Sequence, residues 1–202
     1  MHELPIQKRE SGDDRRLAIA AAARAIIVEK GLEGLRTRDI AARVGINVAT
    51  LHYHVPSKEA LVALVAESIR IDFKTQFGRR SRVGKTALDL LRMEFEDFAE
   101  TLTDAPELIV VIAELSERAR RDDGIAAIVS PLGSFWREQF VEILRLGTED
   151  GSFRPDIDPI AGALIITGAL SDYGRLRGSF SSMPTLFAEL ERAFMRSNPS
   201  QG

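Results

Sequence analysis

The fold is decided by residues 37–58, which read TRDIAARVGINVATLHYHVPSK. Apolar residues in the first half of this stretch recur at the spacing of one helical face, so a short helix is predicted there. Thr37 is the expected N-cap of that helix, because its side-chain oxygen can accept a hydrogen bond from a free amide at the helix start. Gly45 is expected to end the helix, since glycine tolerates the left-handed backbone of a sharp turn.

A second short helix is predicted at Val48–His54, with Asn47 as its cap and Pro56 as its stop. With about seven residues at ~1.5 Å each, it spans roughly 10 Å. Ser57 is then placed to cap a longer helix that begins at Lys58. Two short helices joined by a tight turn form a helix-turn-helix.

Only Leu51 of the second helix is expected to face the core. The other side chains are small, hydroxyl or ring groups, which suit base edges, thymine methyl groups and phosphates better than a packed interior. The pattern therefore favours a helix that enters the major groove of DNA. For each residue the alternative is an ordinary solvated side chain. The candidate DNA-contacting residues are Thr37, Arg38, Asn47, Val48, Thr50, Tyr53, His54 and Lys58.

The candidates differ in the part of DNA that each would meet. Arg38 could pair with a guanine, an interaction worth about 1–3 kcal/mol of discrimination. Tyr53 and His54 are expected mainly at phosphates, and Lys58 would join the amides of its own helix start in holding one. The side chains expected at bases are Val48 and Thr50.

The spacing of the motif extends upstream into an amphipathic segment and downstream into the next helix. The residues that carry it are Ala22, Ala23, Ile26, Ile27, Gly31, Thr37, Ile40, Ala41, Gly45, Ile46, Thr50, Leu51, Tyr53, His54, Lys58 and Leu61. They resemble the DNA-binding domain of the tetracycline-repressor (TetR) family of bacterial transcription regulators. His52 and Val55 depart from the family pattern, which usually has tyrosine and phenylalanine there, so the base preference does not follow from the resemblance.

Composition limits the classes of protein that this chain can be. It has 202 residues, of which 45% are hydrophobic and 28% charged, as in a globular protein of one or two domains. It has no cysteine, which excludes disulfides and thiolate zinc sites. No apolar run reaches the roughly 18 residues of a membrane helix. The first ten residues lack the apolar core of a signal peptide, so a cytoplasmic location is expected.

Charge is distributed unevenly along the chain. Residues 1–58 hold ten Lys and Arg against seven Asp and Glu, whereas the remainder holds seventeen against twenty-three. A basic head on an acidic body fits DNA at one end. We therefore predict a DNA-binding domain at residues 1–58. The resemblance implies that residues 59–202 form a ligand-binding and dimerisation domain.

Beyond the motif only helical periodicity is found, so an all-α fold of about nine helices is predicted, as the resemblance also implies. Residues 78–84, GRRSRVG, are interpreted as a flexible basic stretch. The carboxylates of Glu94, Glu96 and Asp97 are expected on a solvated helix face. A helix over residues 125–146 is expected to break near Pro131.

A cavity between the C-terminal helices is expected to bind a small molecule. This expectation rests largely on the resemblance. Plain core packing is the alternative for each candidate. The candidate lining residues are Met93, Phe95, Phe98, Leu102, Trp136, Phe140 and Tyr173, with Glu114 or Arg137 as polar anchors.

The last two predicted helices, residues 160–176 and 183–195, are more apolar than one small bundle needs. In TetR-like proteins such helices pair with their twins, and the resemblance implies a homodimer here. A two-fold dimer would read a palindromic operator. The resulting hypothesis is a ligand-responsive DNA-binding repressor that a small, largely apolar molecule releases from its operator.

Three other interpretations stay open: an activator, a helical sensor with a vestigial DNA head, and an enzyme. The enzyme would use Gly84, Lys85 and Thr86, which resemble the end of a phosphate-binding P-loop. However, Arg79 stands where that loop needs a glycine, and a helix precedes it. No nucleophile elbow occurs, so no catalytic residue and no cofactor are assigned.

Histidines invite a metal interpretation, which their spacing opposes. His52 and His54 are two residues apart on a helix and point about 200° from each other. They cannot bind one ion together, and no metal site is predicted.

Overall fold

The computed structural model describes residues 12–176 and 181–196, and this part of the chain is helical throughout apart from its loops and one isolated bridge, between Phe153 and Met195. The elements are α1 (Gly12–Lys30), the 3-10 turn η1 (Leu32–Gly34), α2 (Thr37–Val44), α3 (Val48–His54), α4 (Lys58–Gly78), α5 (Ala87–Asp104), α6 (Pro106–Ala119), α7 (Asp123–Asp150), α8 (Pro159–Leu176) and α9 (Met183–Phe194). The predicted all-α fold is confirmed. Among the helices described here, none has the length and apolar character needed to cross a membrane.

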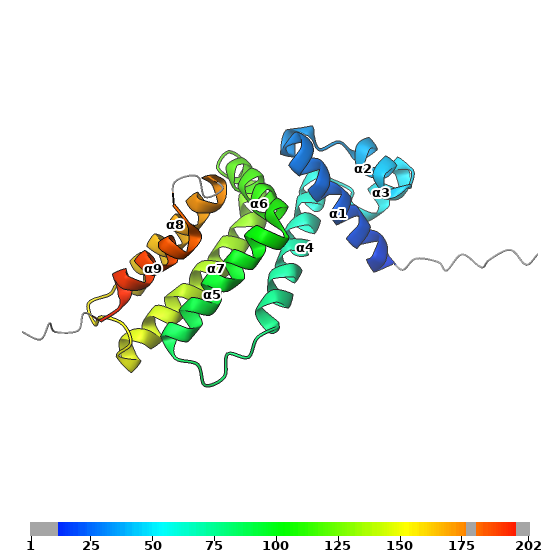
Figure 1. Cartoon of the computed structure of the whole chain (residues 1–202). Helices are drawn as coiled ribbons and strands as arrows, with labels where there is room; N and C mark the ends of the chain where they lie inside the picture. Colours follow the sequence, from blue (N-terminus) through cyan, green and yellow to red (C-terminus); the bar gives the residue numbers. More distant parts are fainter. Residues whose placement is uncertain (1–11, 177–180, 197–202) are drawn as a thin grey trace, which may run out of the picture.

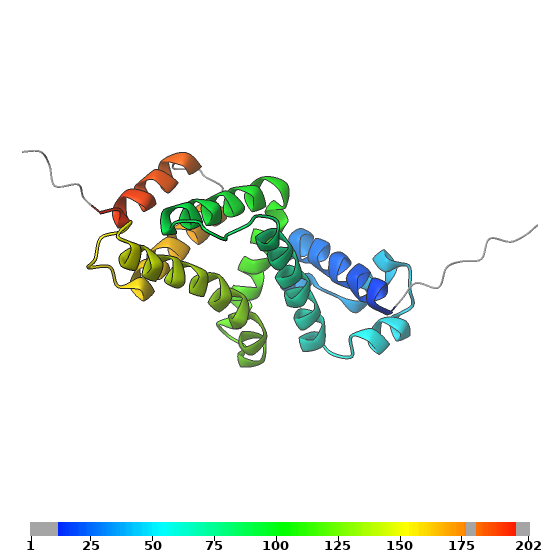
Figure 2. The ribbon, with the colours of Figure 1, turned by 90° about the horizontal axis from the view of Figure 1, so that it is seen from below.

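The helices form an elongated molecule whose two ends are built from different helices (Figure 1). The helix-turn-helix of α2 and α3 lies at one end beside α1, and α8 and α9 lie at the other (Figure 1). The same separation is seen from below (Figure 2). The helix α4 leaves the helix-turn-helix and runs toward the bundle, so it connects the two ends (Figure 1).

The N-terminal end has its own hydrophobic core, which also takes in part of the bundle. The apolar stripe of α1 is buried in it, and Leu51 of α3 and Val65 of α4 are fully buried in the same cluster. Val111 and Leu115 of α6 belong to the same cluster. The residues of the α1 stripe are Ile19, Ala22, Ala23, Ile26 and Ile27. The N-terminal end therefore packs directly on α6.

A second core joins α5, α7, α8 and α9. Phe95, Phe140 and Phe194 are among its buried aromatic residues. Gly147 of α7 allows the ring of Phe153 to lie against the helix, because a Cβ at this position would be 1.9 Å from the ring. The loop after α7 is thus folded back onto the bundle.

The predicted break near Pro131 is wrong, since α7 is one helix of 28 residues with Pro131 inside it. Val129 before the proline and Phe140 after it are both buried, in the first and the second core respectively, which holds the two halves in one helix. Asp122 caps the start of α7, with its Oδ1 accepting a hydrogen bond from the amide of Ile125 at 3.1 Å.

Candidate DNA-binding surface and effector cavity

The turn between α2 and α3 is built as the sequence indicates. Gly45 has φ of 74° and its amide donates back to the carbonyls of Ala41 and Ala42. The prediction for Thr37 as N-cap is wrong, because Thr37 is the first residue of α2 and Arg36 occupies the cap position without a side-chain cap bond. The helix starts one residue earlier than expected because Arg36 already has the extended backbone of a cap residue.

The helix α3 is capped by the side chains that the sequence indicates. Asn47 Oδ1 accepts a hydrogen bond from the amide of Thr50 at 2.7 Å. After the helix, Ser57 Oγ accepts one from the amide of Ala60 at 3.1 Å and so starts α4. The predicted caps on both helices are confirmed. Each cap satisfies a free amide at its helix start, so α3 and α4 begin at defined residues.

The side chains of α3 divide into one buried anchor and an outward face. Leu51 is fully buried, whereas Tyr53 is 85% exposed and Val48 is 40% exposed. Thr50 and His54 are half-buried. The ring of Tyr53 meets that of His54 edge-on, with centroids 5.3 Å apart. An exposed row of this kind on a helix with a buried anchor suits contact with a groove.

Long-range contacts fix the position of α3 and its neighbours. Arg16 of α1 donates from Nη1 to the carbonyl of His54 at 3.2 Å, which satisfies an acceptor at the end of α3. Lys58 Nζ lies 4.0 Å from Glu33 Oε2. The Arg38 side chain is 72% exposed, with its Nε 3.7 Å from Asp39 Oδ1.

The helix α6 holds the DNA-binding end through two side chains one turn apart. Glu114 Oε2 accepts a hydrogen bond from the amide of Leu32 at 3.0 Å. Arg118 Nη1 pairs with Glu33 at 3.0 Å and its Nη2 with Asp122 at 3.1 Å. Glu114 was expected to anchor a ligand, and the structure places it at η1 instead.

A cavity of about 1070 Å³ lies among α4, α5, α6, α7 and α8. Its wall is largely apolar and includes Phe73, Phe77, Phe98, Ile112, Trp136 and Leu170. Of the residues predicted to line a pocket, the structure brings Phe98 and Trp136 together, as stacked rings 6.2 Å apart. The predicted residues that do not line this cavity are Met93, Phe95, Leu102, Glu114, Arg137, Phe140 and Tyr173.

Core packing explains most of these differences. Phe140 is fully buried in the second core, and Leu102 and Tyr173 pack against that core. Apolar side chains at helical spacing fit a core and a cavity wall equally well, so the sequence pattern does not separate the two.

Two helices present one face to the cavity and another to the DNA-binding end. On α4, Val65 is buried in the N-terminal core and Phe73 lines the cavity. On α6, Leu115 belongs to that core, and Ile112 and Ser116 line the cavity. A molecule in the cavity would therefore touch both helices that support α1 to α3.

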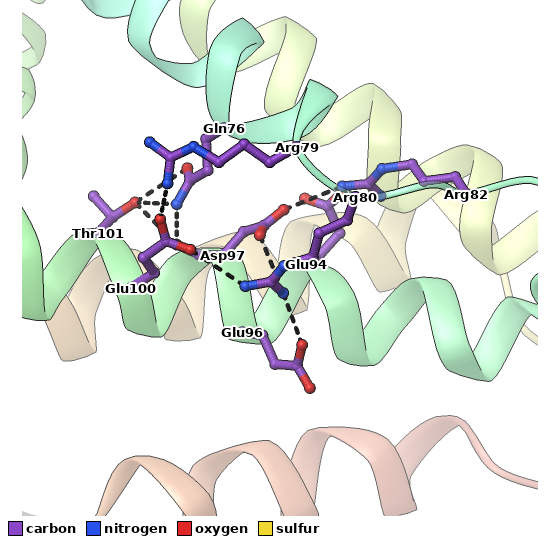
Figure 3. A network of polar contacts seen from close by, with 9 residues as sticks. All are labelled: Gln76, Arg79, Arg80, Arg82, Glu94, Glu96, Asp97, Glu100 and Thr101. Carbon is purple, nitrogen blue, oxygen red and sulfur yellow. Dashed lines mark hydrogen bonds and ion pairs between the residues drawn. The ribbon is translucent and has the colours of Figure 1, made fainter.

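The stretch at residues 78–84 is tied down by ion pairs. Figure 3 shows Arg79, Arg80 and Arg82, which follow α4, facing carboxylates on α5. Arg82 pairs with Glu94 at 2.7 Å. Arg80 pairs with Glu96 at 2.7 Å. Arg79 pairs with Glu100. The further distances are 3.1 Å from Arg82 to Asp97 and 3.2 Å from Arg80 to Glu100.

The expectation of a solvated face for Glu94 and Asp97 is therefore wrong. Glu94 is only 6% exposed, because the guanidinium of Arg82 covers it. Burial raises the pKa of Glu94, and the Arg82 guanidinium opposes this shift. Burial also raises the pKa of Asp97, against the effect of Arg80 and Arg82. The Arg82 guanidinium also lies over the Phe77 ring, 3.8 Å from the ring centroid.

Residues 19–65 match the family described as bacterial regulatory proteins, tetR family. The transcriptional repressor KstR2 of Mycolicibacterium smegmatis is 31% identical over 147 residues, which cover 71% of this chain and 70% of the relative. The chain belongs to the TetR family. KstR2 of Rhodococcus jostii is 29% identical over 157 residues, which cover 76% of this chain and 75% of that one.

Solved structures agree with TetR membership at the level of the fold. A transcriptional regulator from Saccharomonospora viridis, in complex with choline, superposes with a TM-score of 0.78 at 22% identity, covering 92% of this chain and all of that one. The ketosteroid regulator KstR2 of Mycobacterium tuberculosis gives 0.66 at 20% identity, covering 95% and 98%. The predicted class, a ligand-responsive DNA-binding repressor of the TetR type, is confirmed.

Several contacts of this TetR-family protein have no signal in its sequence. Arg16 and His54 are 38 residues apart, and Glu114 and Leu32 are 82 apart. Both pairs use a backbone group as one partner, and backbone groups are the same at every residue. Charge complementarity between residues 79–82 and the acidic face of α5 was the one signal available, and it was missed.

Proposed function

We propose that this protein acts as a homodimer on a palindromic operator and is released from it when a small organic molecule fills the cavity. The observation that carries the proposal is the outward face of α3, which keeps Tyr53 and Val48 exposed around the buried Leu51. A DNA regulator of this kind works in the cytoplasm. The proposed domains are residues 1–58 for DNA and 59–202 for the ligand and the dimer.

The DNA contacts would come from α2, α3 and the start of α4. Val48 and Thr50 would meet bases, and Arg38 a base or a phosphate. Tyr53, His54 and Lys58 would contact phosphates and fix the register. Asn47 would act by holding the start of α3, and the proposed contact of Thr37 is with the backbone of the DNA.

The dimer would form through α8 and α9. On α8, Ile160, Leu164 and Ile165 are 64%, 61% and 58% exposed and form one apolar strip along the helix. Exposed Ala161 and Gly168 on the same helix would let a second helix approach closely. Large apolar side chains grouped on one surface mark an interaction site more often than free surface. This end lies opposite the helix-turn-helix, so two copies could each present α3 to one half-site (Figure 1).

The effector would act through α4 and α6, because both helices line the cavity and pack on the DNA-binding end. It must bind the DNA-free arrangement more tightly than the DNA-bound one, since only differential affinity shifts such an equilibrium. Choline and ketosteroids, named with the two structural relatives, are both small organic molecules. A cavity of about 1070 Å³ has room for ligands of either size.

The first test is selection of bound fragments from the source genome by purified protein at two salt concentrations. A palindrome enriched at both concentrations would support the proposal. Sequence-blind binding that collapses with salt would leave only the electrostatic part and favour the vestigial head. A reporter fused to the recovered operator then separates repression from activation.

Variants make the same test specific to α3 and the start of α4. Tyr53→Ala and Lys58→Ala should each weaken operator binding, and Lys58→Ala should lower the slope of log affinity against log salt by about one. Lys85→Ala removes an exposed lysine from the loop between α4 and α5 and serves as the matched control. Unchanged operator binding in both the Tyr53 and the Lys58 variant would refute the assignment of this surface.

A further inference from the structure

The cavity has a negative side that its apolar lining does not predict. Glu94 and Asp97, both on α5, line the cavity, and their side chains are only 7% and 12% exposed. A buried carboxylate is costly unless a positive charge compensates it. The charge that these two groups present to the cavity therefore limits what can bind there.

The arginines that pair with these carboxylates approach from outside the cavity. Arg79, Arg80 and Arg82 come from the segment after α4 (Figure 3). None of these three arginines is among the residues that line the cavity. A ligand in the cavity would thus lie against Glu94 and Asp97, whereas none of the three arginines belongs to the wall that it would touch.

The arginines do not fully balance the negative charge of these carboxylates. The network joins four carboxylates to three guanidinium groups (Figure 3). Asp97 Oδ1 is buried, lies 3.4 Å from Arg80 Nη1 and accepts no hydrogen bond from any described residue. Burial raises the pKa of both Glu94 and Asp97 in spite of the arginines nearby. One further positive charge would be stabilised at this place.

Aromatic rings stand next to the carboxylates. Phe98 follows Glu94 by one helical turn and shares its face of α5. Trp136 of α7 stacks on Phe98, with an angle of 18° between the ring planes, and both line the cavity. Phe77, also in the wall, already carries the Arg82 guanidinium over its ring. Aromatic faces attract cations, and a carboxylate beside them adds to that attraction.

The basic side chains of the cavity are at its rim and have acidic neighbours. Arg70, Arg120 and Arg175 have side chains that are 42%, 79% and 71% exposed. Each pairs with a carboxylate on its own helix, and Lys74, the fourth basic lining residue, is exposed. The three paired carboxylates are Glu67, Glu117 and Asp172. An anionic ligand would meet no buried cation in this wall, whereas a cationic ligand would meet Glu94 and Asp97.

We propose that the effector is an organic cation, an ammonium or guanidinium group on an apolar body, whose charge is bound by Glu94 and Asp97 against the rings of Phe98 and Trp136. The proposal rests on the proposed function, because it names the ligand class of the same cavity. The apolar body would occupy the remaining wall of α4, α6 and α7.

Binding to the full chain can be measured without DNA, using calorimetry and three probes of similar size. The probes are benzyltrimethylammonium, its uncharged isostere neopentylbenzene and the anion 3-phenylpropanoate. The cation should bind at least about tenfold more tightly than the isostere, as a desolvated cation–π contact beside a carboxylate requires. Equal or tighter binding of the isostere or the anion, or no detectable binding of the cation, would overturn the proposal. The comparison uses the unaltered protein, so it does not depend on whether a variant folds.

Two variants test which carboxylate binds the positive charge of the ligand. Glu94→Gln should weaken binding of the cation about tenfold and leave the isostere unaffected. Glu96→Gln removes the same charge from the same network, but Glu96 is 65% exposed and does not line the cavity, so the cation should bind this variant as it binds the unaltered protein. Equal losses of affinity for the cation in both variants would indicate a general effect of the negative charge of the network and would contradict a binding site at Glu94.

Operator release is measured separately. Selective binding of the cation without release of DNA would support the cation site and contradict the proposed regulation. Release of DNA by neutral molecules alone would support the regulation and contradict the cation site.

Discussion

Glu114 Oε2 accepts a hydrogen bond from the backbone amide of Leu32 at 3.0 Å and so joins α6 to the turn that leads into the helix-turn-helix. The same helix lines the cavity with Ile112 and Ser116. The contact therefore offers a route from a bound effector, through α6, to the turn that precedes α2.

Glu114→Ala is expected to lower the free energy of unfolding by about 1.5–3 kcal/mol, because the Leu32 amide loses a charged acceptor. It should also reduce the fold-change in operator affinity that the effector produces. Chemical denaturation and fluorescence anisotropy with labelled operator measure the two effects. Glu138→Ala, which removes an exposed glutamate of α7, is the control. A full effector response in Glu114→Ala would exclude this contact from the route.

Asn47→Ala should destabilise α3 by about 0.5–2 kcal/mol, since the amide of Thr50 loses its cap. Amide hydrogen exchange in α3 should become faster and operator affinity should fall. Asn47→Ser keeps a capping oxygen and should restore most of both. Loss of operator binding in Asn47→Ser with normal exchange would mean that Asn47 contacts DNA directly.

Leu164→Arg should convert the dimer to a monomer, because it places a charge in the exposed apolar strip of α8. Light scattering after size-exclusion chromatography gives the mass in solution. Val83→Arg makes the same exchange at a site that is 91% exposed in the loop between α4 and α5, and it should stay dimeric. A dimeric Leu164→Arg protein would place the interface elsewhere.

Gly147→Ala should destabilise the bundle by about 1–3 kcal/mol, since the added Cβ would clash with the Phe153 ring. Gly133→Ala changes another glycine of the same helix, where the nearest atom is 3.8 Å from the added Cβ. That variant should be stabilised by roughly 0.5–1 kcal/mol, because alanine loses less backbone entropy in a helix. Thermal unfolding of the two proteins should therefore shift in opposite directions.

Glu94 should make stability depend on pH with a definite sign. Burial raises its pKa in the folded state above the ordinary value of 4.5, so the folded protein holds this proton more tightly than the unfolded chain does. The stabilisation is complete below pH 4.5 and is lost as the pH rises through the folded-state pKa. Glu94→Gln should remove that decline. If the free energy of unfolding of the two proteins changes in parallel with pH above 4.5, the assignment to Glu94 is wrong.

The sequence predicted best where structure depends on neighbours along the chain. Val48–His54 and the caps at Asn47 and Ser57 follow from side chains within three residues of the groups they satisfy. The position of Leu51 also follows, because a short helix offers few side chains for burial. These local features are enough to define the helix-turn-helix and hence the family.

The sequence predicted least where the partner is distant or where one pattern fits two environments. Glu94 and Asp97 look solvated on a helical projection, and only the folded chain shows that Arg82 covers them. Phe98 and Phe140 have the same apolar character, yet one lines the cavity and the other fills the core. Periodicity reports which face of a helix is turned inward, and it carries no information on whether that interior is filled.

The ion pairs of the three arginines after α4 hold the C-terminal end of this helix in place. Arg79, Arg80 and Arg82 bind its C-terminal end to α5, whereas its N-terminal end carries the helix-turn-helix. With 21 residues α4 is roughly 31 Å long, so a tilt of about 5° about its fixed C-terminal end moves Lys58 by roughly 3 Å. In the proposed symmetric dimer the two displacements add, so the separation of the two α3 helices would change by about twice that amount.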